Sequence, residues 1–472
     1  MGSDMPLIVV LPGIGGSVLS RSDRPDDVVW DAGKGDITDL LVHPDRISLS
    51  ASPSLAPVGL TSSTKLLGFT LVPGYERLLQ QLEVFGVVDR RGDPSRPVPG
   101  AAVVAVPYDF RQSIALAAER LDDVVRAHLG ETSEEERARR VLVVAHSLGG
   151  LVARYWLGPL GRWRWCGQLI TLGTPHRGAP KALDWLVNGV RVGGQQLSRP
   201  TGLLREWPSV RELLPRYQVV RSTVRGEAVS CYPHELPLVE LAGARAAYDL
   251  HAAIDQAWSE MPRSGTKVVP CVGWSHPTPS AAFWNGRVLS VTKEHPGWLN
   301  LPELEQDFGD GTVPALSAVP VEMSTEVTAP VRLLDRHVPM AAVARVSELL
   351  VTFLQGRRLE AVHGAEPART AAIGLDLEEL YGEGEPIPLS VALRQVPPGR
   401  DSQPVWVTLR RQRARRGATL DVRLVWDAVA QRFVGELPGQ AVGLYEVTVL
   451  AREVPQVGDL AVTGTLAVVA DD

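Results

Sequence analysis

The stretch VLVVAHSLGG, Val141–Gly150, decides the fold because an apolar strand runs directly into a serine and two glycines. The residues that follow, Leu151–Leu157, have the pattern of a helix. A serine at a sharp turn between a strand and a helix is held in the open, where its hydroxyl can reach a substrate carbonyl. Such a turn needs small neighbours, and Ala145 and Gly149 provide them on the two sides of Ser147. We therefore predict that Ser147 is a nucleophile, rather than an incidental serine in an ordinary strand–turn–helix.

Other short apolar runs stand before turn residues and suit strands that are buried on both faces of a parallel sheet. They are Leu7–Leu11, Ala101–Val106, Val141–Ala145, Gln168–Leu172, Lys267–Val272 and Val331–Leu334. Between or after these runs, apolar residues recur three and four positions apart, as in a helix. The pattern is clearest in Ile114–Leu129 and Met340–Leu354. Alternating strands and helices predict a doubly wound α/β structure. With a serine at the turn, we predict the α/β-hydrolase fold over residues 1–355.

Two regions depart from this alternation. The first is 187–265, which mixes Pro, Gly and charged residues, and we predict that it is an inserted cap. Half of the 12 tryptophans lie in or near it, either as core of the cap or as an apolar wall for an acyl chain: Trp185, Trp207, Trp258, Trp274, Trp284 and Trp298. The second is 388–472, where short strand-like segments without helices follow a predicted linker over 356–387. We predict an immunoglobulin-like β-sandwich there.

A serine hydroxyl needs a base, and in this fold the chain order is serine, acid, histidine. His337 follows an apolar run and precedes a helix, which places it at the carboxyl end of a strand. The turn Gly309-Asp310-Gly311 can present a carboxylate that orients the imidazole. We predict His337 as base and Asp310 as acid. Asp307 remains an alternative acid, whereas Asp335 is read as a turn residue.

The N-terminal stretch PLIVVLPGIGGSVL, Pro6–Leu19, ends a strand in a glycine-rich loop. Such a loop lets backbone N–H groups approach a developing oxyanion, and the N–H of Leu148, just after the nucleophile, is expected to supply a second donor. A dinucleotide fingerprint needs a third glycine, but Val18 stands at that position.

Bulk properties are those of an ordinary globular protein. The chain has 472 residues, a net charge of -6 and three separated cysteines, which argues against nucleic acid as a partner and against a zinc ribbon. No metal or other cofactor is expected. There is no long apolar stretch and no recognisable signal segment, so we expect a cytoplasmic protein that makes peripheral contact with a membrane.

The motifs together resemble the lecithin:cholesterol acyltransferase family, which includes lysosomal phospholipase A2-like enzymes. The matching pieces are LPGIGGS, PYDFRQS at Pro107–Ser113, AHSLGG, FGDGTVP and HVPM, in the family's order. The resemblance covers about residues 6–354. Departures are the lack of cysteine in Ser17–Tyr75, where the family's lid carries a disulfide, and the additional β domain.

The resemblance implies acyl transfer from a lipid ester through a serine acyl-enzyme. It makes Ser147, Asp310 and His337 the catalytic triad and assigns the oxyanion hole to the N–H groups of Ile14 and Leu148. Asp109 and Arg111, in the PYDFRQS segment, are expected to support the site without reacting. His176, in a segment similar to bacterial triacylglycerol lipases, is expected to be structural.

These observations predict a serine hydrolase that cleaves or transfers acyl groups of lipid esters. The alternatives are a short-chain or triacylglycerol esterase and, from another class, a catalytically idle fold that binds a protein partner through its β domain. The expected substrate is a lipid or other acyl ester. Five arginines in 410–416 are either an exposed hairpin tip or a contact for anionic lipid headgroups.

Overall fold

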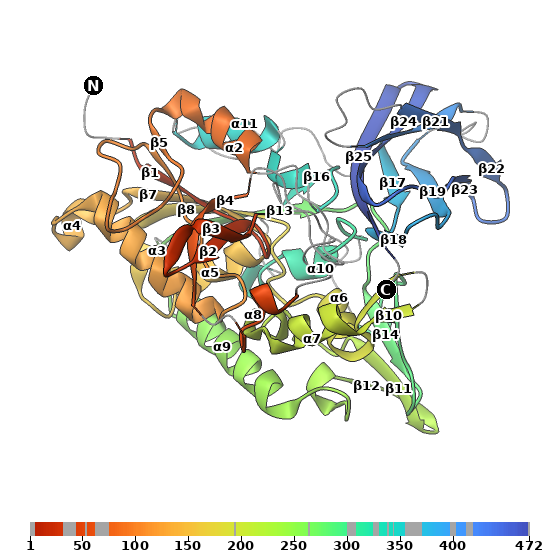
Figure 1. The fold of residues 1–472 in the computed structure, drawn as a ribbon, viewed down its shortest axis with the longest axis horizontal. Helices are drawn as coiled ribbons and strands as arrows, with labels where there is room; N and C mark the ends of the chain where they lie inside the picture. Colours follow the sequence, from red (N-terminus) through yellow and green to blue (C-terminus); the bar gives the residue numbers. More distant parts are fainter. Residues whose placement is uncertain are drawn as a thin grey trace.

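The computed structural model of the protein is shown in Figure 1. It describes residues 5–31, 44–51, 54–61, 75–192, 195–262, 265–299, 308–323, 330–337, 339–342, 344–354, 371–396, 403–411 and 419–470. A large α/β part contains the central sheet, a group of helices and short strands lies at the bottom of Figure 1, and a β-sandwich lies at the upper right.

Parallel strands form the central sheet, in the order β16-β13-β8-β7-β1-β6-β5. Each pair of neighbours is parallel. Every apolar run predicted as a strand contributes to this sheet, which has the architecture of an α/β-hydrolase-like fold. The strands are β1 (Leu7–Leu11), β5 (Val88–Asp89), β6 (Val103–Ala105), β7 (Val141–His146), β8 (Cys166–Leu172), β13 (Lys267–Gly273) and β16 (Val331–Leu333).

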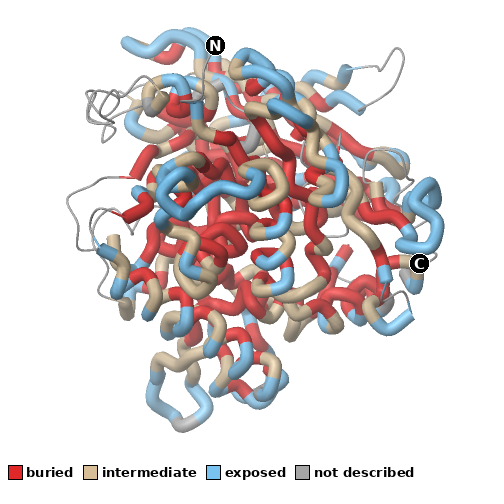
Figure 2. The backbone as a smooth tube through the Cα atoms, turned by 90° about the vertical axis from the view of Figure 1, so that its left-hand side faces the viewer, coloured by how far each residue is buried: buried red, intermediate tan, exposed pale blue. Residues whose placement is uncertain are grey.

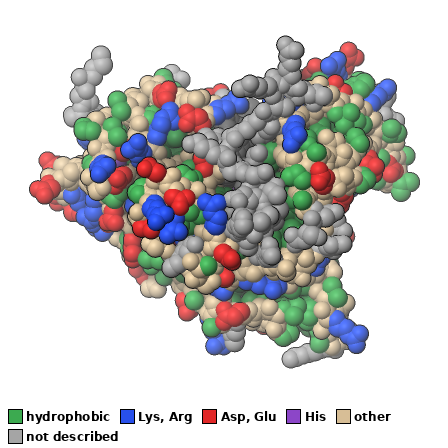
Figure 3. All heavy atoms as spheres, viewed as in Figure 1, with side chains coloured by type: hydrophobic (Ala, Val, Ile, Leu, Met, Phe, Trp, Pro, Cys, Tyr) green, Lys and Arg blue, Asp and Glu red, His purple; other side chains and the backbone are tan. Residues whose placement is uncertain are grey.

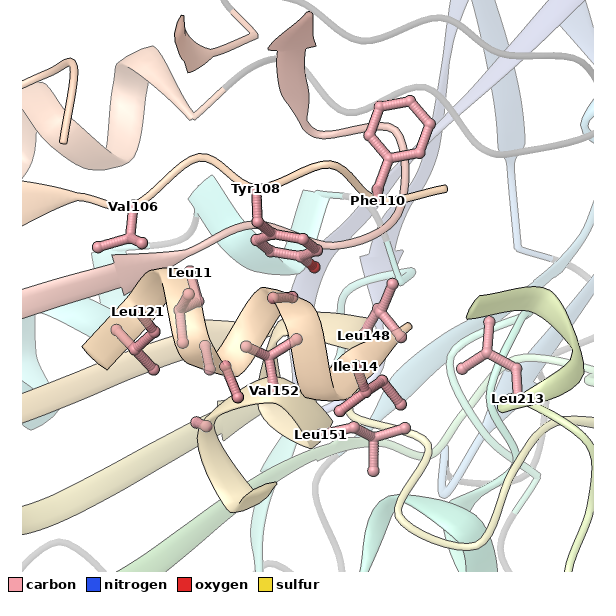
Figure 4. Packing of buried hydrophobic residues seen from close by; sticks show 14 of the residues in the cluster. Leu11, Val106, Tyr108, Phe110, Ile114, Leu121, Leu148, Leu151, Val152 and Leu213 are labelled. Carbon is pink, nitrogen blue, oxygen red and sulfur yellow. The ribbon is translucent and has the colours of Figure 1, made fainter. Parts of the chain in front are cut away.

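Helices cover both faces of this sheet, so its strands are buried on both sides. Val9 and Val143 pack toward α3 (Ile114–Leu129) and α5 (Leu148–Leu157). The alternate residues of the same strands pack toward α2 (Glu76–Leu82) and α11 (Ala344–Leu354). Figure 4 shows the first of these clusters from close by, and Figure 2 shows buried residues gathered in the interior with exposed turns at the rim.

The elements at the bottom of Figure 1 are those between β8 and β13, joined by a hairpin beyond β13. They are α6 (Pro180–Asn188), β9 (Val190–Val192), β10 (Gln195–Leu197), α7 (Ser198–Glu206), α8 (Pro208–Arg211), β11 (Val220–Arg225), β12 (Glu227–Cys231), α9 (Leu241–Ser259), β14 (Ala281–Trp284) and β15 (Leu289–Thr292). The sheet β12-β11-β14-β15 therefore continues past the predicted cap boundary of 187–265. The limits of the cap stay a prediction.

Smaller elements complete the α/β part. An antiparallel sheet, β3-β2-β4, follows the N-terminal glycine-rich loop. Its strands are β2 (Ser17–Arg21), β3 (Arg24–Trp30) and β4 (Leu55–Leu60), and two short helices are α4 (Glu134–Arg137) and α10 (Ala315–Ala318). Among the described helices, none is long and apolar enough to cross a bilayer.

Two sheets, β17-β19-β23-β22 and β18-β25-β24-β20-β21, enclose a separate apolar core and form the C-terminal β-sandwich. Its strands are β17 (Ala372–Asp376), β18 (Leu380–Gly382), β19 (Ile387–Arg394), β20 (Val405–Arg411), β21 (Thr419–Arg423), β22 (Val425–Asp427), β23 (Arg432–Leu437), β24 (Gly443–Val454) and β25 (Gly458–Val469). The immunoglobulin-like character of this sandwich stays a prediction.

The predicted linker, 356–387, needs correction because β17 and β18 lie inside it. The physical reason is that β17 pairs with β19 and buries Ile373 and Leu375 in the sandwich core, which a solvated linker would not do. The earlier part of the predicted linker, 356–370, lies outside the described residues.

Candidate active site

Ser147 occupies a strained turn between β7 and α5. Its φ of 51° is in the left-handed region, a backbone conformation that residues other than glycine rarely adopt. The turn is crowded on its helical side, since a Cβ at Gly149 would lie 2.5 Å from the carbonyl oxygen of Pro12. Strain of this kind is held in place by surrounding contacts and fixes the direction of the side chain. The tight packing explains why small residues stand beside Ser147.

The structure brings the hydroxyl of Ser147 together with the two side chains that the sequence predicts to act with it. The Oγ of Ser147 lies 3.0 Å from Nε2 of His337, and Nδ1 of His337 donates to Oδ2 of Asp310 at 2.7 Å. Ser147 and His337 are each 7% exposed and Asp310 is 1% exposed, so water is largely excluded from the hydrogen bonds. Three residues from distant parts of the chain thus form one continuous line at the carboxyl edge of the sheet.

The carboxylate of Asp310 is held ionised by its neighbours. Burial alone would raise its pKa, but the charge and hydrogen bond of His337 and the N–H groups of Val313 and Thr312 outweigh burial and lower the pKa. The backbone of Asp310 also accepts from the N–H of His337 at 2.9 Å. The acid therefore fixes both the tautomer and the position of the imidazole. Asp307, the alternative acid, lies outside the described residues.

The glycine-rich loop after β1 lies directly against Ser147. A Cβ at Gly13 would lie 2.9 Å from the Cβ of Ser147, and Ile14 lines the same pocket as the serine. Leu148 is the first residue of α5, so its N–H is among the helix donors that have no partner within the helix. These positions are compatible with the predicted oxyanion hole at Ile14 and Leu148, and its assignment stays a prediction.

A second histidine connects this loop to His337, and sequence reasoning did not identify it. The N–H of Gly13 donates to the hydroxyl of Tyr75 at 2.7 Å, and that hydroxyl donates to Nδ1 of His146 at 2.8 Å. Nε2 of His146 in turn donates to the backbone carbonyl of His337 at 2.9 Å, which fixes its tautomer because a carbonyl can only accept. Burial, assisted by the nearby charge of His337, lowers the pKa of His146 to about 3. His146 is therefore a neutral connector.

The pocket beside Ser147 is lined by both apolar and polar side chains. The apolar ones are Pro175, Ala179, Ala182, Trp185, Leu213 and Val313, and the polar ones include Lys181, Thr312 and Glu379. Its cavity volume is about 50 Å³, which holds a few water molecules but no long acyl chain. Of the six tryptophans considered as an acyl wall, Trp185 lines this pocket, whereas Trp207 packs against Phe110.

The PYDFRQS segment packs behind the glycine-rich loop rather than in the pocket. Arg111 pairs with Asp109 at 2.7 Å and donates to the carbonyls of Ile47 and Ser48, and it is fully buried. Neither side chain lines the pocket. The residue of this segment that holds the glycine-rich loop is Tyr108, whose hydroxyl donates to the carbonyl of Pro12 at 2.7 Å. The sequence predicts Asp109 and Arg111 of this segment as supporting residues but not Tyr108, because a hydrogen bond to a distant backbone carbonyl leaves no pattern in the sequence.

The remaining predicted residues lie away from the serine. His176 is buried beside Thr171, with a contact of 3.3 Å from its Nε2 to the threonine hydroxyl. Arg410 pairs with Glu446 at 2.7 Å on the surface of the sandwich, and 412–416 of the arginine-rich segment lie outside the described residues. Within the part of the chain that the structure describes, no three His, Cys, Asp or Glu side chains gather to hold a metal ion.

Comparisons with known proteins point to one family. Residues 55–260 match the profile of the family described as lecithin:cholesterol acyltransferase, a range that includes Ser147 but not Asp310 or His337. A search of curated protein sequences finds no match.

Solved structures give weaker likenesses. The lipase BlEst2 of Bacillus licheniformis in its mature form is 14% identical, with 75% of this chain and 94% of that chain covered and a TM-score of 0.29. Its propeptide form is 11% identical, with 98% and 94% covered and a TM-score of 0.30. A superoxide reductase of Ignicoccus hospitalis is 10% identical, with 23% of this chain and 92% of that chain covered and a TM-score of 0.18. Scores this low decide neither fold nor function.

Proposed function

We propose, from the match of residues 55–260 to the lecithin:cholesterol acyltransferase family, that this chain is a serine-dependent enzyme that hydrolyses or transfers the acyl group of a lipid ester. The family match supports an acyl ester hydrolase or acyltransferase in general terms. The serine mechanism rests on one observation, the line of hydrogen bonds from Ser147 through His337 to Asp310.

In the first half of the reaction, the Oγ of Ser147 attacks the ester carbonyl carbon while Nε2 of His337 takes the hydroxyl proton. Asp310 stabilises the imidazolium that forms. The carbonyl oxygen becomes an oxyanion, which the N–H groups of Ile14 and Leu148 stabilise. When the tetrahedral intermediate collapses, the bond to the leaving alcohol breaks and His337 returns the proton to that alcohol. The acyl group is then bonded to Ser147.

In the second half, a water molecule or an acceptor alcohol attacks the acyl-enzyme. His337 takes a proton from the attacking hydroxyl and gives it to the Oγ of Ser147 as the acyl–enzyme bond breaks. Water gives a free fatty acid, and an alcohol gives a new ester. Neither half of this reaction requires a metal or an organic cofactor.

A fluorophosphonate probe tests the proposal directly. We expect the purified chain to become labelled and to release fatty acid from a mixed lipid extract, and Ser147→Ala to do neither. Ser133→Ala is the matched control, because Ser133 caps the exposed helix α4 far from the pocket. A wild-type chain that stays unlabelled and cleaves no ester would leave the alternative of a binding protein.

A short-chain esterase is the second candidate, and the small pocket beside Ser147 favours it. A series of esters that differ only in acyl length separates the two candidates. For a lipid enzyme whose pocket opens for its substrate, kcat/KM should rise as the acyl chain of the ester lengthens. A short-chain esterase should show the reverse trend, because a rigid wall at Trp185 and Leu213 would exclude longer chains.

Peripheral contact with a lipid surface is part of the proposal. It is supported by exposed apolar side chains at Val224 and Val229, which line one groove of the sheet β12-β11-β14-β15, and at Val288 in the turn between β14 and β15. Figure 3 shows hydrophobic side chains gathered over this sheet at the lower right. Apolar groups collected in this way mark contact surfaces more often than singly scattered ones.

A further inference from the structure

The β-sandwich contributes a charged side chain to the pocket of the candidate active site. Glu379 lies between β17 and β18 and is 6% exposed, and it lines the same pocket as Ser147. Its Oε2 pairs with Nζ of Lys181, a residue of α6 in the α/β part. Its Oε1 accepts from the hydroxyl of Thr312 at 3.2 Å, two residues after Asp310. One carboxylate therefore joins the sandwich, α6 and the acid loop.

The position of Glu379 is fixed by buried contacts on both sides of it. The guanidinium of Arg336, the residue before His337, donates to the carbonyl oxygens of Leu375 and Leu377 at 2.8 and 3.0 Å. The N–H of Leu375 donates to Nδ1 of His276 at 3.2 Å. The main-chain carbonyl of Glu379 accepts from Ala467 in β25 at 2.9 Å. The sandwich cannot turn away from the pocket without breaking the contacts of Arg336 and His276.

Lys181 and Glu379 form a neutral pair in a place with little water. The side chain of Lys181 is 16% exposed and that of Glu379 is 5% exposed. The Nζ of Lys181 also lies 5.4 Å from the ring centre of Trp185, which lines the same pocket. A leaving group bound in this pocket therefore lies near the charged pair. In a site of low dielectric, an added charge without a counter-charge is strongly disfavoured.

We propose that the Lys181–Glu379 pair, built by two parts of the chain, is a specificity element that selects esters whose leaving group carries no net charge. The carboxylate accepts from hydroxyl groups of such a leaving group and the ammonium group donates to its oxygens. For an anionic leaving group, the repulsion from Glu379 offsets the attraction to Lys181. Because the leaving group also loses its hydration on entering the pocket, its binding there is unfavourable. This inference rests on the proposed function, because it assigns a role in the reaction at Ser147.

The test compares two esters that differ by one phosphate, a monoacylglycerol and a lysophosphatidic acid with the same acyl chain. The measured quantity is the ratio of kcat/KM for the anionic ester to that for the neutral ester. Glu379→Gln leaves Lys181 without its counter-charge and should raise this ratio roughly tenfold. Lys181→Gln leaves Glu379 unpaired and should lower the ratio. The double variant should return toward the wild-type ratio.

A neighbouring residue provides the control. Glu378 pairs with Lys293 at 2.7 Å, and its side chain is 66% exposed. Glu378→Gln removes the same charge from the same loop at a side chain that does not line the pocket, so it should move the ratio by less than Glu379→Gln does, because solvent screens its charge from Lys181. Unfolding midpoints of all variants show whether each one folds.

The two single variants must shift the ratio in opposite directions. Equal shifts, shifts in one direction, or no shift at all in variants that fold would overturn the specificity role. That result is distinguishable from failure of the proposed function. In the former case the wild type cleaves both esters and Ser147→Ala cleaves neither, whereas in the latter the wild type cleaves no ester.

Discussion

The imidazole of His146 donates to the backbone carbonyl of His337 at 2.9 Å, and the two rings lie with their centres 4.9 Å apart. The residue before Ser147 thus holds the loop that carries the residue proposed as its base. Through Tyr75, the same imidazole is also connected to the N–H of Gly13. The serine turn, the histidine loop and the glycine-rich loop are therefore linked by three hydrogen bonds outside the triad.

This connection predicts that His146 is a positioning residue. His146→Ala removes both hydrogen bonds and should lower kcat about tenfold to a hundredfold, because small misplacements of reacting groups are costly. His146→Gln can still accept from Tyr75 and donate to the carbonyl, and it should recover much of that loss. Since the pKa of His146 is lowered to about 3, both variants should keep any titration near neutral pH seen in the wild-type rate profile. A wild-type kcat in His146→Ala would contradict the role.

The acid is tested by a pair of amide substitutions. Asp310→Asn keeps the shape of the side chain, but its amide NH2 can donate to Nδ1 of His337, where the carboxylate accepts. The imidazole would then hold the wrong tautomer, so kcat should fall by about four orders of magnitude. Asp307→Asn is the control, since Asp307 was the alternative acid in the sequence. Measured rates on a soluble ester decide between them. If Asp307→Asn shows the large loss and Asp310→Asn does not, the acid has been assigned to the wrong residue.

Local patterns explain why some of the site could be predicted and some could not. The triad residues each follow a strand or lie in a glycine turn, and such positions can be predicted from the local sequence pattern. They are Ser147, Asp310 and His337. The contact of Tyr75 with His146 spans 71 residues and that of Lys181 with Glu379 spans 198, and neither leaves a periodic signal. Glu379 also lies in a charged, glycine-containing stretch, a composition that is typical of a solvated linker. In the structure, β17 and β18 on either side of it belong to the sandwich.

The buried guanidinium of Arg336 predicts that the sandwich contributes to the stability of the α/β part. Arg336→Met removes the donors to Leu375 and Leu377 and leaves two buried carbonyl groups without them. The free energy of unfolding should fall by about 2–4 kcal/mol. Urea unfolding measures this change, and Arg24→Met, in an exposed position of β3, is the control. Equal stability of the two variants would show that the contact between the parts contributes little.

The exposed apolar side chains of the sheet β12-β11-β14-β15 predict where the protein meets a lipid surface. Val224 and Val288 are each 55% exposed, and the backbone at Gly286 lies close to the side chain of Val224. Exchanging both valines for serine should weaken binding to phosphatidylcholine vesicles by about thirtyfold or more, since each buried valine contributes of order 1 kcal/mol or more. The measurement is co-sedimentation with vesicles, accompanied by the unfolding midpoint.

The matched control for this surface is Val429→Ser, because Val429 is 96% exposed but belongs to the sandwich. Its vesicle binding should equal that of the wild type. The decisive pattern is a loss confined to the pair Val224 and Val288, with unchanged unfolding midpoints in all variants. Equal losses at Val429 would mean that vesicles bind any exposed apolar residue, and undiminished binding of the double variant would remove this sheet as the lipid contact.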